Sequence, residues 1–287
     1  MDTKVEIGFF LCVLCVLHGG STPRAQSTPE IVFGAEARRD RFQYHFDNPS
    51  SFDTPFAVPH FFEQRYVADN VWAVITLRYI AGVRWETSIG ATPRRTTTAD
   101  DYDTFVDPDG TSWVSGTTGG AAMRSFRISQ QANVGRAGAV AFVAGYRLRM
   151  DFADFQLGHK TVTRNGALAL AADVTSPETT SSRLTELLLG ATASFSLDPE
   201  WRLSIHAEGA PLAVGRLLVR LPEKYPGRDI VSAAKVVTGS ARVTLARRRG
   251  HWPIELSADV GRSWSYKATD RLTYDQLGAR LTVGRVW

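Results

Sequence analysis

One polar stretch of the sequence concentrates five aspartates, namely Asp100, Asp101, Asp103, Asp107 and Asp109. Neighbouring carboxylates raise one another's pKa and can share a proton, and such a pair can activate a water molecule for hydrolysis. Asp101 and Asp103 are therefore the candidate catalytic pair. The alternative is structural, because aspartate favours loops and Pro108-Asp109-Gly110 is a turn sequence. The spacing does not fit a calcium-binding EF-hand loop, so we predict no metal site and no cofactor.

A second polar group consists of Ser204, His206 and Glu208, which alternate along the chain. In a strand, residues two apart share a face but lie ~6.8 Å from one another, because the rise is ~3.4 Å per residue. A nucleophile and its base must approach to ~3 Å. We therefore expect a buried polar ladder here in place of a hydrolase triad. The sequence contains no phosphate-binding loop, dinucleotide fingerprint or zinc-ligand spacing.

The elements that position these side chains are strands, and the last one is the clearest. In the final stretch, 272–287, one face carries Leu277, Ala279, Leu281 and Val283, and the other carries Gln276, Gly278, Arg280, Thr282 and Gly284. One face suits hydrocarbon and the other suits water or polar partners. A chain that ends on an aromatic residue, here Trp287, after such a strand is typical of an outer-membrane β-barrel.

The connections set the number of strands. Short turns near residues 80, 136, 198 and 249 alternate with long connections near 57, 107, 167, 224 and 269. Short turns face the periplasm in such barrels, so the strand before residue 80 descends and needs an ascending strand before it. Residues 31–46 are the candidate. The fold class is therefore all-β, a transmembrane antiparallel up-and-down β-barrel of ten strands, or of eight if residues 31–46 form a tail or plug.

Three connections are predicted to be long loops: 47–69 with three prolines, 93–122 rich in Thr, Asp and Gly, and a polar stretch that ends near Ser182. Long connections without secondary structure are usually functional or mobile, so we expect the function in the outer loops. The first loop is also rich in aromatic rings, which form either an exposed binding surface or a lid over the mouth.

The polar face of the strands carries charges of both signs, at Arg78, Arg84, Glu86, Arg127, Arg147, Arg149, Asp151, Glu186, Arg202, Glu208, Arg242, Glu255, Asp259 and Arg280. A secreted sandwich or lipocalin-like barrel, the soluble alternative, would bury its apolar face, and these charges are too many for its small interior. The interior of a barrel of about eight strands is already filled by side chains, so a barrel of ten strands leaves little room in its lumen. We expect a lumen filled by ion pairs and exclude a wide pore.

The N-terminal 25 residues have the features of a secretory signal peptide, with Lys4, an apolar run over 7–17 and a small-residue exit at Ala25. The barrel then occupies residues 26–287. Both cysteines, Cys12 and Cys15, lie in the signal, so the mature chain has no disulfide. A net charge of +4, from 33 basic and 29 acidic residues, does not indicate nucleic-acid binding.

Several of these features resemble the omptins, a family of outer-membrane endopeptidases. They are the ten strands with five outer loops, Ser88-Ile89-Gly90-Ala91 at the end of a hairpin, the Asp101/Asp103 pair in the next loop, and Val143-Ala144-Gly145-Tyr146 after a short turn. In omptins an Asp pair faces an Asp-x-His pair across an extracellular cleft, and together they activate the attacking water. Asp101 and Asp103 match the first pair, whereas residues 207–231, where the second should lie, contain no histidine.

These observations favour a monomeric barrel in the outer membrane of a Gram-negative bacterium, with a non-enzymatic surface, structural or ligand-binding role. The alternatives are an omptin-like endopeptidase that uses Asp101 and Asp103, and a narrow solute channel. The expected partners are outer-membrane lipid, including lipopolysaccharide, and the barrel-assembly machinery, which would recognise the strand that ends at Trp287. We expect no nucleic-acid partner, and the sequence does not identify the ligand or the ligand-binding residues.

Overall fold

A computed structural model describes residues 29–46, 61–106, 109–175, 178–220, 222, 229–247, 252–265 and 270–286, and nearly all of them are strand. The predicted signal peptide, residues 47–60 of the first predicted loop, Asp107 and Trp287 lie outside the described residues. Among the residues that are described, no helix is long and apolar enough to cross a membrane.

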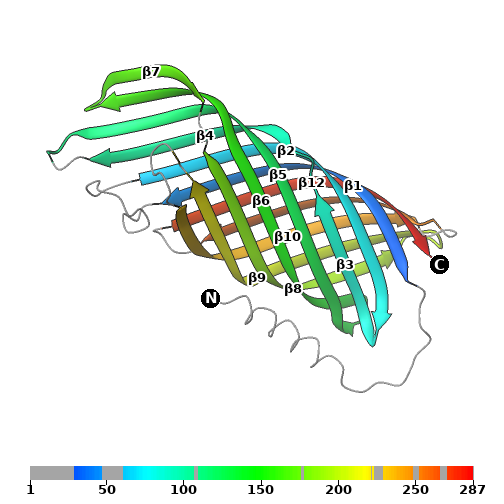
Figure 1. The fold of residues 1–287 in the computed structure, drawn as a ribbon. Coiled ribbons are helices and arrows are strands. Elements are labelled where there is room, and N and C mark those ends of the chain that lie inside the picture. Colours follow the sequence, from blue (N-terminus) through cyan, green and yellow to red (C-terminus); the bar gives the residue numbers. More distant parts are fainter. Residues whose placement is uncertain are drawn as a thin grey trace.

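The strands are β1 (Glu30–Phe46), β2 (Phe61–Ala81), β3 (Val83–Ala91), β4 (Arg95–Val106), β5 (Ser112–Ala137), β6 (Val140–Arg164), β7 (Ala167–Thr175), β8 (Thr179–Ser196), β9 (Trp201–Arg220), β10 (Asp229–Arg247), β11 (Ile254–Ser265) and β12 (Asp270–Val286). Strands β3 and β4 follow one another between β2 and β5, and β7 and β8 follow one another along β6. Each of these two pairs occupies one position in the barrel wall. The twelve strands therefore fill ten positions, and all neighbouring strands are antiparallel (Figure 1).

The ten positions close into a ring, because β1 pairs with both β12 and β2. From β2 the hydrogen-bonded order continues through β3, β5, β6, β8, β9, β10 and β11 back to β12. The ten-stranded barrel is thus confirmed. The first strand is a full member of the wall, paired over Glu30–Phe46 on both sides, so the eight-stranded alternative is wrong. A barrel closed in this way has no free strand edge within the ring.

Side chains alternate across the wall as the sequence of the last strand predicts. Leu277 is 62% exposed and Leu281 54%, whereas Arg280 is 7% exposed. The same outward apolar face continues around the ring, with Phe33, Ile75, Ile89, Leu189, Ile205, Val243, Leu256 and Val260. Such a belt would be unfavourable against water, at about 25 cal/mol for each Å² of apolar surface, and it suits the hydrocarbon of a bilayer. The strands therefore span a membrane.

Two of the predicted loops are wrong, because the residues form strands. Most of 93–122 belongs to β4 and to the first half of β5, and the stretch before Ser182 contains the end of β6, β7 and the start of β8. Residues 61–69 of the first predicted loop likewise begin β2. We call β4 and β7, with the parts of β5 and β6 that pair with them, the outer sheet. It projects beyond one end of the ring (Figure 1).

The alternation of apolar and polar residues did not predict the strands of the outer sheet, for a physical reason. Beyond the membrane the outward face of a strand meets water in place of lipid, and the inward face of β4 buries polar residues such as Asp101 and Asp103, so the alternation of apolar and polar residues is lost. Asn165 and Gly166, with φ of 49° and 81°, make the two-residue turn between β6 and β7, the geometry that an Asn-Gly pair favours in hairpins. This dipeptide is the signal that the loop assignment overlooked.

The tips of the two hairpins are joined to each other. The Asn165 N–H donates to the Ser112 carbonyl at 2.7 Å, and the Ser112 N–H donates to Asn165 Oδ1 at 2.8 Å. The turn expected at residues 108–110 is present in its described part, where Gly110 has a φ of 86° and Asp109 Oδ1 accepts from the Thr111 N–H at 2.9 Å. The outer sheet is therefore a connected structure.

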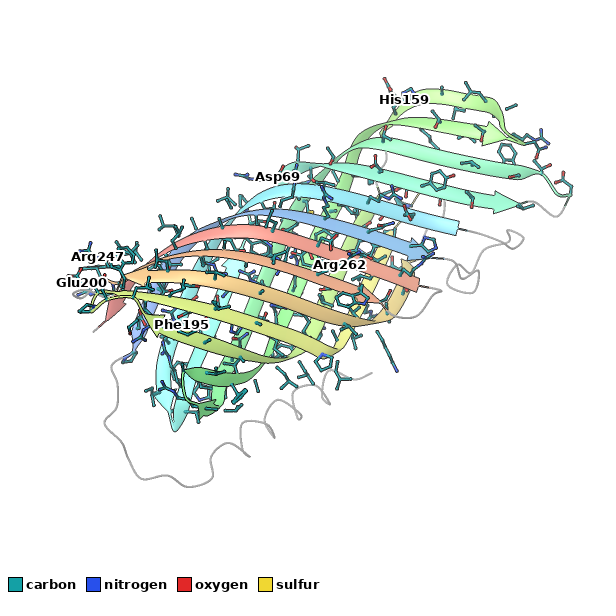
Figure 2. The ribbon with its side chains drawn as sticks, turned by 180° about the vertical axis from the view of Figure 1, so that it is seen from behind. Asp69, His159, Phe195, Glu200, Arg247 and Arg262 are labelled. Carbon is teal, nitrogen blue, oxygen red and sulfur yellow. The ribbon has the colours of Figure 1, made fainter. Side chains whose placement is uncertain are left out.

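The two ends of the barrel differ in character. Figure 2 shows His159 on the outer sheet, and Glu200 and Arg247 at the opposite end, where their side chains lie 3.3 Å apart. That opposite end carries the short turns and the ends of β1 and β12 nearest the chain termini. Since short turns face the periplasm in outer-membrane barrels, the outer sheet lies on the extracellular side.

Candidate functional site

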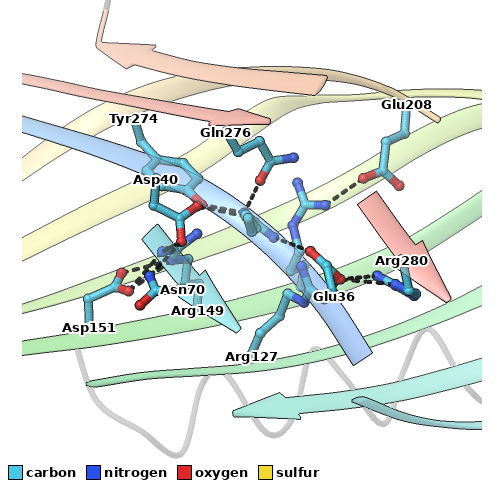
Figure 3. Close-up of polar contacts among 12 residues, drawn as sticks. Glu36, Asp40, Asn70, Arg127, Arg149, Asp151, Glu208, Tyr274, Gln276 and Arg280 are labelled. Carbon is cyan, nitrogen blue, oxygen red and sulfur yellow. Dashed lines mark hydrogen bonds and ion pairs between the residues drawn. The ribbon is translucent and has the colours of Figure 1, made fainter. Parts of the chain in front are cut away.

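The centre of the lumen is filled by ion pairs around Glu36 (Figure 3). This fully buried carboxylate, on β1, accepts hydrogen bonds from Arg127 on β5 at 3.0 Å and from Arg280 on β12 at 2.7 Å. Arg38, next on the inward face of β1, lies 3.1 Å from Glu36 and 2.7 Å from Asp40. Three strands thus meet on one carboxylate inside the ring.

Asp40 is the second centre of this network. The Tyr274 hydroxyl donates to it at 2.6 Å and the Asn70 amide at 3.1 Å, and Arg149 of β6 lies 3.4 Å away. Arg149 also pairs with Asp151 at 2.9 Å. Because a buried charge is tolerated when it is paired and hydrogen-bonded, these groups hold one another in place.

The arginines of the network surround one aromatic ring. Trp72 of β2 is fully buried, and the guanidinium groups of Arg38, Arg127 and Arg149 lie 5.5, 5.1 and 5.4 Å from its ring centroid. The face of an indole attracts cations at this range. The attraction of the ring therefore offsets part of the repulsion among the three positive charges.

Two smaller ion-pair groups fill the rest of the charged lumen. Arg78 of β2 binds both carboxylate oxygens of Glu255 on β11, at 2.7 and 2.8 Å. Arg147 of β6 lies 2.5 Å from Glu186 and 2.5 Å from Glu208. The sequence-based expectation of a lumen filled by ion pairs is confirmed.

Between this network and the outer sheet, apolar side chains occupy the interior. A cluster of buried residues joins Phe42 and Tyr44 of β1 and Tyr66 of β2 to Leu217 and Val219 of β9. Rings pack directly, with Phe42 and Tyr274 centroids 4.6 Å apart. Within the part of the chain that the structure describes, charged and apolar side chains together fill the lumen.

The group formed by Ser204, His206 and Glu208 is a polar ladder, as expected. Ser204 Oγ lies 3.0 Å from Ser194 Oγ and not against the histidine. His206 instead lies between the Thr192 hydroxyl at 2.8 Å and Glu208 at 3.1 Å. Since Glu208 is also held by Arg147, the histidine belongs to the structural filling of the lumen.

The candidate pair Asp101 and Asp103 lies on β4, in the outer sheet. Both side chains point inward and are buried, at 4% and 5% exposure, whereas Asp100 points to the other face. In the strand register Gln64 of β2 and Thr117 of β5 flank Asp101. The structure thus places the two carboxylates on one face of one strand, above the filled part of the lumen.

Asp109 does not join this pair. It lies in the β4–β5 turn, where the N–H of Thr111 holds the pKa of the Asp109 carboxyl below its ordinary value. Its role is to shape the turn, which is the structural alternative that the sequence offered.

The wall where an Asp-x-His pair would face Asp101 and Asp103 is mostly apolar in its described part. The inward side chains on the outer half of β9 are Ala213, Leu217 and Val219, and β10 adds Val236 together with the hydroxyl residues Ser232 and Thr238, all buried. Asp229, at the start of β10, points to solvent and binds Arg220 at 2.9 Å. The described residues of 207–231 therefore supply no second catalytic pair.

One Asp–His pair does exist in the outer sheet, and sequence analysis missed it. His159 Nδ1 of β6 lies 2.9 Å from Asp173 of β7. The strand register aligns His159 with Thr118 and Thr118 with Asp100. The pair therefore shares the face of Asp100, opposite the face of Asp101 and Asp103, and does not complete an omptin-like set.

Among the described residues, no group of three or more His, Cys, Asp or Glu side chains is placed to hold a metal ion. The residues at the centre of the lumen, Glu36, Arg38 and Asp40, were also missed from the sequence. The outward face of β1 carries Ala35, Ala37 and Arg39 at the same level, so it lacks the apolar contrast that reveals a membrane strand.

Comparisons with known proteins identify the fold. No protein-family model matches the chain, and no curated protein matches its sequence. The crystal structure of the outer-membrane protease OmpT from Escherichia coli matches with a TM-score of 0.67 and 7% identity, over 93% of this chain and 100% of OmpT. The β domain of the Bordetella autotransporter BrkA matches with a TM-score of 0.39 and 8% identity, over 89% and 99% of the two chains.

The toluene transporter TodX of Pseudomonas putida also matches, with a TM-score of 0.28 and 9% identity over 92% of this chain and 90% of TodX. The OmpT likeness establishes the fold, since its TM-score alone exceeds 0.5 among the three. Together with the outward apolar belt, the fold identifies the chain as a β-barrel of the bacterial outer membrane, with an omptin-like ten-stranded architecture.

Proposed function

We propose that the chain is a non-enzymatic binding barrel of the cell surface, whose outer sheet contacts a ligand outside the cell. The observation that carries this proposal is the contrast between a filled lumen and a projecting sheet. Ion pairs such as Arg149–Asp40 cross the lumen, and on this basis we expect solutes not to pass. The outer sheet, in contrast, exposes backbone and side chains beyond the membrane, where binding surfaces of such barrels lie.

A second candidate, an omptin-like endopeptidase, is favoured by one specific observation. Asp101 and Asp103 share one inward face, above the filled part of the lumen, in a fold similar to that of the protease OmpT. Paired carboxylates of this kind can activate water. The apolar wall formed by Leu217 and Val219 speaks against it, because it offers no base to face the pair.

Lipid contacts are part of the proposal. Arg183 of β8 stands directly opposite Arg216 of β9 on the outward face, and Lys235 follows on β10. Cationic side chains on the outer surface of a barrel, near the level of the lipid headgroups, attract phosphate groups. We assign this cationic patch to the phosphates of outer-membrane lipid or lipopolysaccharide. The assembly machinery would engage the closing strand β12 and the residue that follows it.

Two measurements separate the three functions. The full-length protein is placed in lipid nanodiscs and immobilised, a mixture of soluble polypeptides is passed over it, and bound and released material is analysed by mass spectrometry. Retention of intact polypeptides supports a binding barrel. Cleaved products that disappear in the Asp101→Asn, Asp103→Asn variant would establish the peptidase instead. Unit conductance steps of the same protein in planar bilayers would establish a channel.

A further inference from the structure

Strand β7 is an open edge of the outer sheet. Its residues 167–175 pair with β6 on one side, and within the described parts of the chain no strand pairs with the other side. The next strand, β8, turns instead to the lower part of β6 and to β9. Figure 1 shows β7 at the margin of the projecting sheet. A strand edge of this length presents a row of backbone donors and acceptors to solvent.

This edge carries one feature that limits pairing with other chains, a register irregularity between Leu168 and Leu170, and lacks most of the others. Proteins protect exposed edges with Lys, Pro, inward-pointing charges, β-bulges or a short strand. The sequence of β7, ALALAADVT, has no basic residue and no proline, and Asp173 is its sole charge. Leu168 is 68% exposed and Leu170 45% exposed. The edge therefore offers aliphatic side chains beside its backbone groups.

The outer sheet has a slight acidic excess although the chain is basic. Its strands, over residues 95–106, 112–123, 157–164 and 167–175, contain four acidic side chains and three basic ones, a net charge of −1, whereas the whole chain carries +4. Asp173 on the edge itself is 80% exposed, and its ion-pair partner is a histidine, His159. A segment with Lys or Arg beside its aliphatic residues complements this charge.

We propose that the β7 edge binds an extended segment of another polypeptide, rich in aliphatic and basic residues, by strand addition. In this mode main-chain hydrogen bonds provide affinity and alternate side chains provide specificity. Leu168 and Leu170 contact the aliphatic side chains of the added strand, and Asp173 pairs with a basic one. This inference rests on the proposed binding function and names its site and its ligand class.

A second copy of the chain in the same membrane does not fit this edge. Two antiparallel β7 strands would be related by a twofold axis perpendicular to the sheet, whereas two barrels in one membrane share an axis along the membrane normal. The outer sheet continues the barrel wall, so its own perpendicular does not point along that normal (Figures 1 and 2). The edge is therefore better suited to a separate polypeptide.

The test uses a fluorescent ten-residue peptide of alternating valine and lysine, and full-length protein in nanodiscs. Binding is followed by fluorescence anisotropy. We expect Leu170→Lys to weaken binding at least tenfold, since it places a charge on the edge and repels the peptide. Thr161→Lys is the matched control, because it adds the same charge on an exposed position of β6, one strand away from the edge. Heat-modifiable migration on a detergent gel verifies that each variant keeps its barrel.

A peptide with alternate backbone amides methylated distinguishes strand addition from general charge attraction. We expect methylation of the amides on the peptide edge that faces β7 to abolish binding. Methylation of the amides on the opposite edge of the peptide should leave binding unchanged. Equal weakening by Thr161→Lys, binding that survives Leu170→Lys, or a β7-dependent dimer with no peptide bound would each overturn the inference. If the Leu170→Lys protein still retains intact polypeptides in the mixture experiment, the binding function stands and the β7 assignment alone fails.

Discussion

Arg149 of β6 and Asp40 of β1 lie 3.4 Å apart although β5, β3 and β2 separate their strands around the ring. An ion pair of this kind spans the lumen. Together with Arg127–Glu36 and Arg78–Glu255 it links distant strands of the barrel wall through the interior. The membrane holds the outer face of the barrel and the ion pairs hold the inner face. Among the described residues, the outer sheet is the part that projects beyond the membrane.

Two adjacent arginines of β1 should differ sharply in their contribution to stability. Arg38 points inward and pairs with Glu36 and Asp40, whereas Arg39 points outward and pairs with the exposed Asp69. Removing one partner of a buried pair costs about 3–5 kcal/mol, because the other charge stays buried. An exposed pair contributes about 0–1 kcal/mol.

We therefore expect Arg38→Met to lower the free energy of unfolding by about 3–5 kcal/mol and Arg39→Met by less than about 1 kcal/mol. Urea titration of the refolded barrel, followed by gel mobility and tryptophan fluorescence, measures both. Equal effects of the two substitutions would mean that the lumen network does not support the barrel.

The turn between β6 and β7 should control the order of the outer hairpin. Gly166 has a φ of 81°, a region that costs a residue with a Cβ about 1–2 kcal/mol. Gly166→Ala should therefore speed amide hydrogen exchange in β6 and β7 by roughly five- to thirtyfold, while exchange in β12 is unchanged. Gly166→Asn is the control and should have the smaller effect, since Asn tolerates this conformation. Uniform exchange in both variants would contradict the turn geometry.

The Arg220–Asp229 pair predicts a local pH dependence above the membrane. Its hydrogen bond, at 2.9 Å, holds the pKa of the Asp229 carboxyl below its ordinary value. Because the pKa in the folded state is lowered, the contribution of the pair is present above the unfolded pKa of about 3.9 and is lost as the pH falls through the folded value. A carboxyl-carbon NMR titration should give Asp229 a lower midpoint in the native protein than in Arg220→Gln. Identical midpoints would exclude the interaction.

The cationic patch predicts a lipid effect. Arg216→Gln should reduce the amount of lipopolysaccharide that co-purifies with the barrel, because it removes one of two facing guanidinium groups. Arg247→Gln is the control, since Arg247 lies at the opposite end of the barrel and pairs with Glu200. Phosphate analysis of the purified proteins measures the difference, and equal phosphate in the two variants would contradict the assignment.

The sequence predicted the parts of this fold that touch lipid and missed those that do not. Strand β12 could be recognised because Leu277 and Leu281 meet hydrocarbon while Arg280 meets the lumen. Strands β4 and β7 lie beyond the membrane, where no apolar face is required, so their Thr, Asp and Ala residues suggested loops. They are strands because their backbone groups hydrogen-bond to neighbouring strands, which a hydropathy pattern does not reveal.

The candidate site shows the same division. Asp101 and Asp103 were selected for their chemistry, but only their place on β4 shows that both face inward while Asp100 does not. The pairing of His159 with Asp173 depends on the register between β6 and β7, which the Asn165-Gly166 turn sets. That register becomes predictable once the dipeptide is recognised as a hairpin turn.

The measurement that tests the account most directly is ion conductance of the purified barrel in planar bilayers. The filled lumen predicts no unit conductance steps for the native protein. The triple variant Trp72→Ala, Arg149→Ala, Tyr274→Ala removes the largest side chains of the central network, and it should conduct if it keeps its heat-modifiable migration. Steady unit steps from the native protein, equal to those of the triple variant, would show that the lumen is open and would contradict a barrel that acts through its outer sheet.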